Sequence, residues 1–166
     1  MGSHQSAAMG RDEWLTPPEI LRELGPFDLD PCAPSESRRP WETALRHFSI
    51  EDDGLKQCWG EGRVWLNPPY GRGTGQWLRR LASHGRGTAL VFARTETADW
   101  HSAIWPLASA VLFLEGRLYF HDITGRRAVA NAGAPSALVA YGSEDAGRLL
   151  ASSLAGQFVF LRRHAA

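Results

Sequence analysis

The sequence predicts an α/β protein built on one mostly parallel sheet, with an antiparallel pair among its late strands. Apolar, β-prone runs, such as residues 63–66 and 88–93, alternate with segments whose apolar residues recur at helical spacing, such as residues 76–82. This alternation is typical of parallel sheets covered by helices. The late strands at 110–114 and 118–120 are joined by a connection so short that it favours antiparallel pairing.

The first half of the chain is predicted to begin with a short, well-delimited helix. Thr16 and Glu19 have the spacing of a capping box, and Pro17 suits the first helical position. Gly25-Pro26 then ends the helix. The elements predicted after it are a strand at 27–30, a short helix at 41–47 and a polar loop at 49–55.

The second half continues the alternation of helices and strands. A helix over 76–81 places Trp77 and Leu78 inward and its two arginines outward. The remaining predicted elements are strands at 88–93, 110–114 and 118–120, a helix at 97–107, a helix at 144–154 with Ser143 as its cap, and a strand at 157–161. With 166 residues, the chain is long enough for one domain with a sizeable core.

Composition narrows the class of protein. The formal net charge is zero, so bulk charge does not indicate a nucleic-acid partner. Lys56 is the only lysine, and this arginine bias suits bidentate phosphate and base contacts but equally reflects a GC-rich genome. The two cysteines, Cys32 and Cys58, are too few for a disulfide framework, and the histidines lack ligand spacing, so no metal is expected.

The sequence also predicts where the domain begins and in which compartment the protein is found. Residues 1–10 resemble an added leader, which leaves residues 11–166 as the single domain. The sequence contains neither a signal-peptide pattern nor an apolar run of membrane-spanning length. We therefore expect a cytoplasmic protein without a membrane partner.

The most informative stretch is Asn67-Pro68-Pro69-Tyr70, which follows the predicted strand at 63–66. Proline cannot donate to a ladder, so the strand ends there, and open α/β sheets bind their ligands at the carboxyl ends of strands. The Asn67 side-chain oxygen and the Pro68 carbonyl are acceptors that can hold the two N–H bonds of an exocyclic base amine. Tyr70 offers a flat face for stacking a base. The structural alternative is a proline-rich strand end with a surface asparagine and a packing tyrosine.

This motif, together with its neighbours, resembles the phage-type DNA N6-adenine methyltransferases, a small Dam-like family. Before it, Thr16-Pro17-Pro18-Glu19 resembles motif X, 27–34 a contracted motif I, and Asp53-Gly54-Leu55 motif III. The resemblance extends from residue 12 to about 142. It implies a Rossmann-like methyltransferase fold and N6 methylation of adenine in double-stranded DNA. The implied cofactor is S-adenosylmethionine, which leaves as S-adenosylhomocysteine.

The resemblance also implies residues that contact the cofactor. These are Trp14, Thr16, Pro17, Asp30, Pro31, Cys32, Asp53, Leu55 and Asn67. The glycine-rich turn usual in motif I is replaced here by 34–37, and the acid that grips the ribose is not identified. Taken alone, the segment 27–34 also fits an ordinary strand end, and 49–55 a solvated loop.

Two polar segments are candidates for contact with DNA. Arg94-Thr95 follows a strand and so lies at the same sheet edge as Asn67, and 121–133 is a polar loop between late strands. The candidate DNA-binding residues are Arg94, Thr95, Arg126, Arg127 and Asn131. The alternatives are a structural arginine and a solvated loop.

Other functions remain open from the sequence. Within the same chemistry, N4-cytosine and glutamine-amide transfer are alternatives, although Asn rather than Ser at the first motif position favours adenine. From another class, a non-catalytic nucleic-acid-binding or anti-restriction module on a methyltransferase scaffold is compatible with the shortened motif I. The sequence does not decide between monomer and homodimer.

Overall fold

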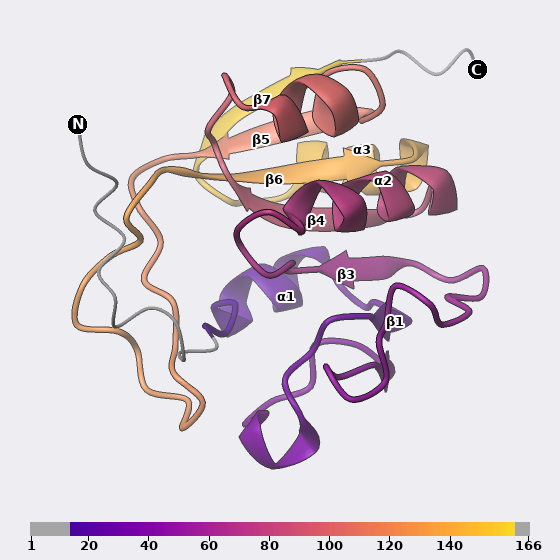
Figure 1. The fold of residues 1–166 in the computed structure, drawn as a ribbon. Coiled ribbons are helices and arrows are strands. Elements are labelled where there is room, and N and C mark those ends of the chain that lie inside the picture. The colour runs from indigo at the N-terminus through magenta and orange to yellow at the C-terminus, as the bar shows by residue number, and fades with distance from the viewer. Residues whose placement is uncertain (1–13, 162–166) are drawn as a thin grey trace.

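The computed structural model describes residues 14–161, and the predicted leader lies outside them. Within this part of the chain, seven strands form one sheet in the order β2-β1-β3-β4-β6-β5-β7 (Figure 1). The strands are β1 (Leu29–Asp30), β2 (Arg46–His47), β3 (Val64–Leu66), β4 (Gly87–Phe92), β5 (Ala110–Leu114), β6 (Ser136–Tyr141) and β7 (Gly156–Phe160). No helix of this part is long and apolar enough to cross a bilayer.

The sheet is parallel on one side and antiparallel on the other. β2, β1, β3 and β4 pair in parallel. β6 is antiparallel to both β4 and β5, and β7 is antiparallel to β5. Five strands therefore run one way and two late strands run the other, which confirms the predicted α/β fold with late antiparallel strands. The arrows of β3 and β5 point to the left of Figure 1, and this side is the carboxyl edge of the sheet.

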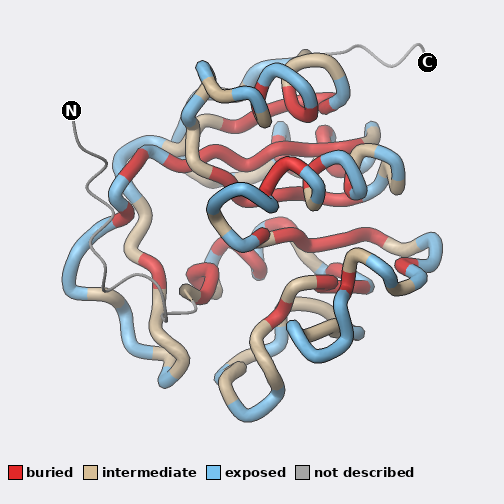
Figure 2. Tube along the Cα trace, viewed as in Figure 1, coloured by how far each residue is buried: buried red, intermediate tan, exposed pale blue. Residues whose placement is uncertain are grey.

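Helices cover both faces of the sheet and divide the core in two. α2 (Thr74–His84) and the π-helical η3 (Trp100–Ile104) pack on one face, where Leu78, Leu81 and Ile104 are buried. α1 (Pro18–Leu24) and α3 (Ser143–Ala151) pack on the other, around Leu24 and Leu149. The central strands lie buried between these layers (Figure 2).

Four local predictions were wrong. Ser143 does not cap α3, because it is the first helical residue, Gly142 is the N-cap, and no side chain caps the helix. Residues 41–47 form no helix: the open edge of β1 takes β2 as a parallel partner, and Leu45 stays 81% exposed, so a helix would have buried little there. Residues 118–120 are not a strand of the sheet. The Phe120 and Leu118 carbonyls accept hydrogen bonds from Ala128 and Ala132 of the following hairpin instead of from a neighbouring strand. The capping box does not form either, since Pro17 is the N-cap of α1 and no side chain caps it.

A buried ion pair joins the elements at the amino edge of the sheet. Arg63, just before β3, donates through Nη2 to Asp145 Oδ1 at 2.7 Å, and both side chains are almost fully buried. The guanidinium also donates to the carbonyls of Leu24 and Pro26 at the end of α1, and Thr88 donates to the same carboxylate oxygen at 3.0 Å. The Arg63–Asp145 pair thus connects α1, β3, β4 and α3 at the edge of the sheet opposite residues 67–70.

Candidate functional site

The catalytic candidates lie where β3 leaves the sheet at its carboxyl edge. The Asn67 side-chain amide donates from Nδ2 to the backbone carbonyl of Trp14 at 3.1 Å. This contact fixes which way the amide faces, because only its nitrogen can donate to a carbonyl. The other end, Oδ1, is left as an acceptor, and among the described residues the Tyr70 hydroxyl donates to it at a long 3.4 Å. The site therefore contains an oriented amide oxygen with spare acceptor capacity.

Tyr70 is held against a second aromatic ring. Its ring stacks on Phe92, the last residue of β4, with centroids 4.3 Å apart and an interplanar angle of 17°. Burial raises the pKa of the Tyr70 hydroxyl, so the group stays protonated and is a donor. Phe92 thus supports one face of the tyrosine.

The loop after Pro69 is anchored by the start of α2. The Thr74 hydroxyl donates to the Pro69 carbonyl at 2.8 Å and accepts from the Gly71 amide at 3.0 Å. Gly71 has a φ of +134°, which side chains with a Cβ rarely adopt. In the described structure, no residue donates a hydrogen bond to the Pro68 carbonyl.

The turn after β1 directly contacts the loop that follows β3. The Cys32 thiol donates to the Asn67 carbonyl at 3.2 Å, and burial raises the pKa of that thiol. Asp30 is 3% exposed and accepts from the Cys32 amide at 3.1 Å and from the Thr43 hydroxyl at 2.6 Å. Burial outweighs these hydrogen bonds and raises the pKa of Asp30 to about 6. A carboxylate here is short of solvation and would gain from a cationic or hydrogen-bonding ligand.

The turn at 53–55, which resembles motif III, packs against the turn after β1. A Cβ at Gly54 would overlap the Pro31 carbonyl, so the two backbones approach as closely as only glycine permits. The Gly54 carbonyl accepts from the Trp59 indole at 2.8 Å, which holds the turn. Asp53 itself is exposed, adopts a φ of +52° and pairs with Lys56 at 2.7 Å. Asp53 and Leu55 therefore flank the turn after β1.

The segment before α1 links the loop that follows β3 to the late loop at 121–133. Leu15 exchanges two backbone hydrogen bonds with His121, of 2.8 and 3.0 Å, while the preceding Trp14 carbonyl holds Asn67. The Trp14 indole nitrogen is buried without a hydrogen-bond partner in the described structure. Thr16 and Pro17 are buried beside it.

The late loop forms an ordered hairpin. The Asp122 carboxylate accepts from the Thr124 hydroxyl and from the amides of residues 124 and 126, and Arg117 donates to the carbonyls of residues 132 and 133. Asp122 organises the tip with these bonds, and its pKa is lowered by them. The candidates Arg126, Arg127 and Asn131 are all exposed, and Arg127 lies 4.0 Å above the Tyr119 ring.

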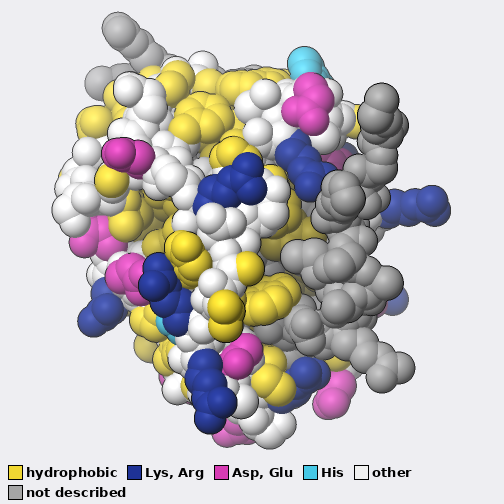
Figure 3. Space-filling model, turned by 90° about the vertical axis from the view of Figure 1, so that its left-hand side faces the viewer, with side chains coloured by type: hydrophobic (Ala, Val, Ile, Leu, Met, Phe, Trp, Pro, Cys, Tyr) yellow, Lys and Arg dark blue, Asp and Glu magenta, His cyan; other side chains and the backbone are white. Residues whose placement is uncertain are grey.

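Arg94 and Thr95 follow β4 at the same edge as Asn67. Exposed Arg94 lines a cavity of about 170 Å³ together with Tyr70 and Phe92, and its guanidinium lies 5.6 Å from the Phe92 ring centroid. The Thr95 carbonyl accepts from the Trp105 indole at 3.2 Å, so this residue also supports the fold. On the carboxyl-edge face, the described side chains that Figure 3 shows are a mixture of basic, acidic and apolar groups.

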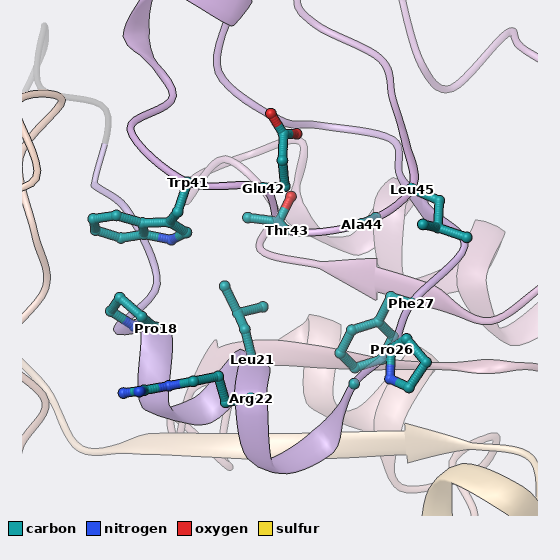
Figure 4. A pocket seen from close by; sticks show the side chains of 11 residues that line it. Pro18, Leu21, Arg22, Pro26, Phe27, Trp41, Glu42, Thr43, Ala44 and Leu45 are labelled. Atoms are coloured by element: carbon teal, nitrogen blue, oxygen red, sulfur yellow. The ribbon is translucent and has the colours of Figure 1, made fainter.

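A larger groove of about 490 Å³ lies beside this site, between α1 and residues 41–45. Its walls are mainly apolar: Leu21 of α1 and Phe27 on one side face Trp41 on the other (Figure 4). Thr43 belongs to this groove and also binds Asp30, so it connects the groove with the turn after β1.

The structure therefore gathers most of the sequence candidates into one region. Trp14, Cys32 and Asn67 are joined by hydrogen bonds, and Asp30, Pro31 and the 53–55 turn adjoin them. The hairpin that carries the candidates Arg126, Arg127 and Asn131 is joined to this region through the Leu15–His121 pairing and through the edge-on contact of the His121 ring with Trp41. Phe92, Thr43 and His121 were missed; only Phe92, at a strand end, carried a usable signal. Among the described residues, no group of three or more His, Cys, Asp or Glu side chains is placed to hold a metal ion.

The fold and the site define an α/β protein that carries an oriented amide, a stacked tyrosine and a buried carboxyl at the carboxyl ends of parallel strands. The model of the DNA N-6-adenine-methyltransferase (Dam) family matches residues 3–150. The chain belongs to this family of DNA N6-adenine methyltransferases. Comparisons with curated proteins and with solved structures gave no match.

Proposed function

We propose that this protein transfers the methyl group of S-adenosylmethionine to the N6 amine of an adenine turned out of double-stranded DNA. The observation that carries the proposal is the Asn67 amide, which the Trp14 carbonyl holds so that Oδ1 is available as an acceptor. This oxygen lies at the carboxyl edge of the parallel strands, where α/β proteins bind their ligands.

Asn67 and Pro68 prepare the amine for attack. The N6 lone pair is delocalised into the purine ring, so the amine is a poor nucleophile. Asn67 Oδ1 and the Pro68 carbonyl accept its two N–H bonds and favour the pyramidal nitrogen of the transition state. Pro68 and Pro69 fix the backbone φ, and Thr74 anchors the Pro69 carbonyl, so these acceptors are aimed before the substrate arrives.

Tyr70 receives the base. With one face resting on Phe92, the ring offers its other face to the adenine, and a base stacked on an aromatic ring gains about 1 to 3 kcal/mol. A base held in this way is within reach of the Asn67 amide, because the Tyr70 hydroxyl already contacts Oδ1 at 3.4 Å.

The turn after β1 and the segment at 14–17 fit the cofactor chemically. S-adenosylmethionine supplies an activated methyl group on a sulfonium, with a carboxylate and an ammonium at the other end. The unpartnered Trp14 indole is a donor for a carboxylate, and the desolvated Asp30 is an acceptor for an ammonium. The proposed cofactor set is Trp14, Thr16, Pro17, Asp30, Pro31, Cys32, Asp53, Leu55 and Asn67. S-adenosylhomocysteine is the expected product.

The proposed DNA contacts lie on both sides of this region. Arg94 lines a cavity together with Tyr70, Thr95 follows it in the chain, and the hairpin presents Arg126, Arg127 and Asn131 to solvent. Because the net charge is zero, the attraction to phosphate is local to these arginines, and binding should weaken steeply with salt.

Asn67→Ala tests the assignment. The variant should lose methylation by at least about a hundredfold, the usual loss for one oriented polar group in a transition state, and this loss should far exceed any loss of cofactor affinity, to which Asn67 is one of several proposed contributors. Mass spectrometry of nucleosides from unmethylated DNA measures N6-methyladenine, and calorimetry measures cofactor binding. Gln76→Ala, on the exposed face of α2, is the matched control.

The same assay separates the alternatives. N4-methylcytosine in place of N6-methyladenine would identify the cytosine branch, and methylation of Asn67→Ala at the normal rate would refute the site. A chain that neither methylates DNA nor binds S-adenosylmethionine would be a non-catalytic nucleic-acid-binding module.

A further inference from the structure

β7 forms an open edge of the sheet at the side remote from β2. It pairs along its full length with β5, and no described residue pairs with its other side. Exposed edges are ready partners for another strand, and proteins usually protect them with charges, prolines or bulges. β7 has none of these: its sequence is Gly-Gln-Phe-Val-Phe.

The ladder with β5 shows which backbone groups face outward. Leu161 donates to Ser109, and Ala155 accepts from Glu115, so the odd-numbered residues exchange hydrogen bonds with β5. In an antiparallel ladder, alternate residues direct both their N–H and C=O to the opposite side. The outer edge therefore presents the backbone groups of Gly156, Phe158 and Phe160.

The side chains at this edge are apolar and exposed. Phe160 is 51% exposed and Val159 is 37% exposed, and Leu150 on the neighbouring helix α3 is 56% exposed. Phe158 and Phe160 lie on one face of the strand, with ring centroids 4.7 Å apart. Gly156 leaves the same face of the strand bare, and it must stay glycine because a Cβ would overlap the Phe113 carbonyl.

We propose that two copies of this chain associate through β7, antiparallel about a two-fold axis at Phe158. In this register, Phe158 faces its own counterpart, and Phe160 of each copy faces Gly156 of the other. The three outward residues of each strand then exchange their N–H and C=O groups in full. Each exposed Phe160 ring covers a bare glycine, an arrangement known to strengthen sheets. In this register, the large Phe160 is opposite the small Gly156, the outward backbone groups are all paired, and no charged residue of β7 is brought together. This self-complementarity favours a second copy over an unrelated strand.

The two-fold axis has a geometric consequence. It is perpendicular to the sheet, so it reverses the strand direction, and the carboxyl edges of the two copies point in opposite directions. The two sites cannot then act on the same short duplex. Association through β7 should leave the rate per chain unchanged, so this inference stands or falls independently of the proposed methylation.

Sedimentation velocity of the full chain tests the dimer. The wild-type protein should sediment as a dimer at tens of micromolar, and Phe160→Lys should raise the dissociation constant by at least about tenfold, because lysine at an edge opposes pairing. Ile50→Lys is the matched control: Ile50 is 89% exposed on a distant turn, and this variant should remain dimeric. A wild-type monomer over this range, or a Phe160→Lys variant that dimerises normally, would overturn the proposal.

Cysteine cross-linking tests the register without relying on a destabilising charge. In a Cys58→Ser background, which removes the exposed native thiol, Phe158→Cys should form an intermolecular disulfide, because directly paired Cα atoms lie about 5.5 Å apart. Val159→Cys should not, since its counterpart is diagonal to it. Equal cross-linking of both variants, or of neither, would overturn the register.

Discussion

Replacing Asp30 by asparagine should remove a fall in folding stability that the wild-type protein shows as pH rises from about 4 to about 6. Asp30 is 3% exposed, and its burial raises the pKa from the ordinary 3.8 to about 6. Between these two pH values, the folded protein keeps a proton that the unfolded chain has released. Unfolding is therefore favoured as pH rises, and the stability present below pH 4 is lost as pH passes 6.

The size of the effect follows from the pKa. At about 1.4 kcal/mol for each pH unit, a rise from 3.8 to about 6 corresponds to about 3 kcal/mol, a large part of the stability of a domain of this size. Asparagine keeps the shape of the side chain but does not titrate, so its stability should not carry this loss.

Urea unfolding at several pH values across this window measures the effect. The free energy of unfolding of the wild-type protein, relative to Asp30→Asn, should fall by up to about 3 kcal/mol between pH 4 and pH 7. Asp53→Asn, which makes the same change at an exposed carboxylate in a neighbouring turn, is the matched control. A constant difference between wild type and Asp30→Asn at all pH values would refute the view that this carboxyl is desolvated.

Substitutions at three further residues probe other contacts. Tyr70→Ala should lower kcat/KM by about ten- to a hundredfold through lost stacking, whereas Tyr70→Phe keeps the ring on Phe92 and should stay within about threefold; equal losses would argue against stacking. Arg63→Met leaves Asp145 buried without its cation and should cost about 3 to 5 kcal/mol in urea unfolding, while a loss below 1 kcal/mol would contradict the described ion pair. Gly54→Ala should destabilise the fold by about 1 to 3 kcal/mol and weaken cofactor binding in calorimetry, since a methyl group there displaces the turn after β1; unchanged affinity would separate Gly54 from the cofactor site.

The sequence predicted the elements whose burial pattern and local signals agree. β5 was predicted with its observed bounds, and β3 and α2 within a few residues, because these segments have unambiguous apolar patterns. Residues 41–47 were wrongly predicted as a helix because their conformation is decided by pairing with β1, a contact across the chain that spacing does not reveal. Residues 118–120 are also β-prone, but β6 and β7 already occupy both sides of β5 in the sheet. Backbone groups of residues 118–120 form their hydrogen bonds within an irregular hairpin instead.

The candidate site was predictable where residue type implies chemistry. The oriented acceptor at Asn67 and the aromatic at Tyr70 follow from the motif, and the structure brings them beside Asp30 and Cys32. The Trp14 carbonyl that orients Asn67 was not predictable, because every residue has a backbone carbonyl and only the fold selects one.

The hydrogen bonds of Trp14 and Leu15 also constrain the order in which the site can be assembled during synthesis. Leu15 is fixed by His121, and the adjoining Trp14 carbonyl holds Asn67, so the Asn67 amide is oriented only once residue 121 is in place. A chain emerging from the ribosome exposes Asn67 long before residue 121 has left the exit tunnel. The geometry around Asn67 is therefore completed only after most of the chain has been made, which delays activity until the hairpin that would contact DNA has also formed.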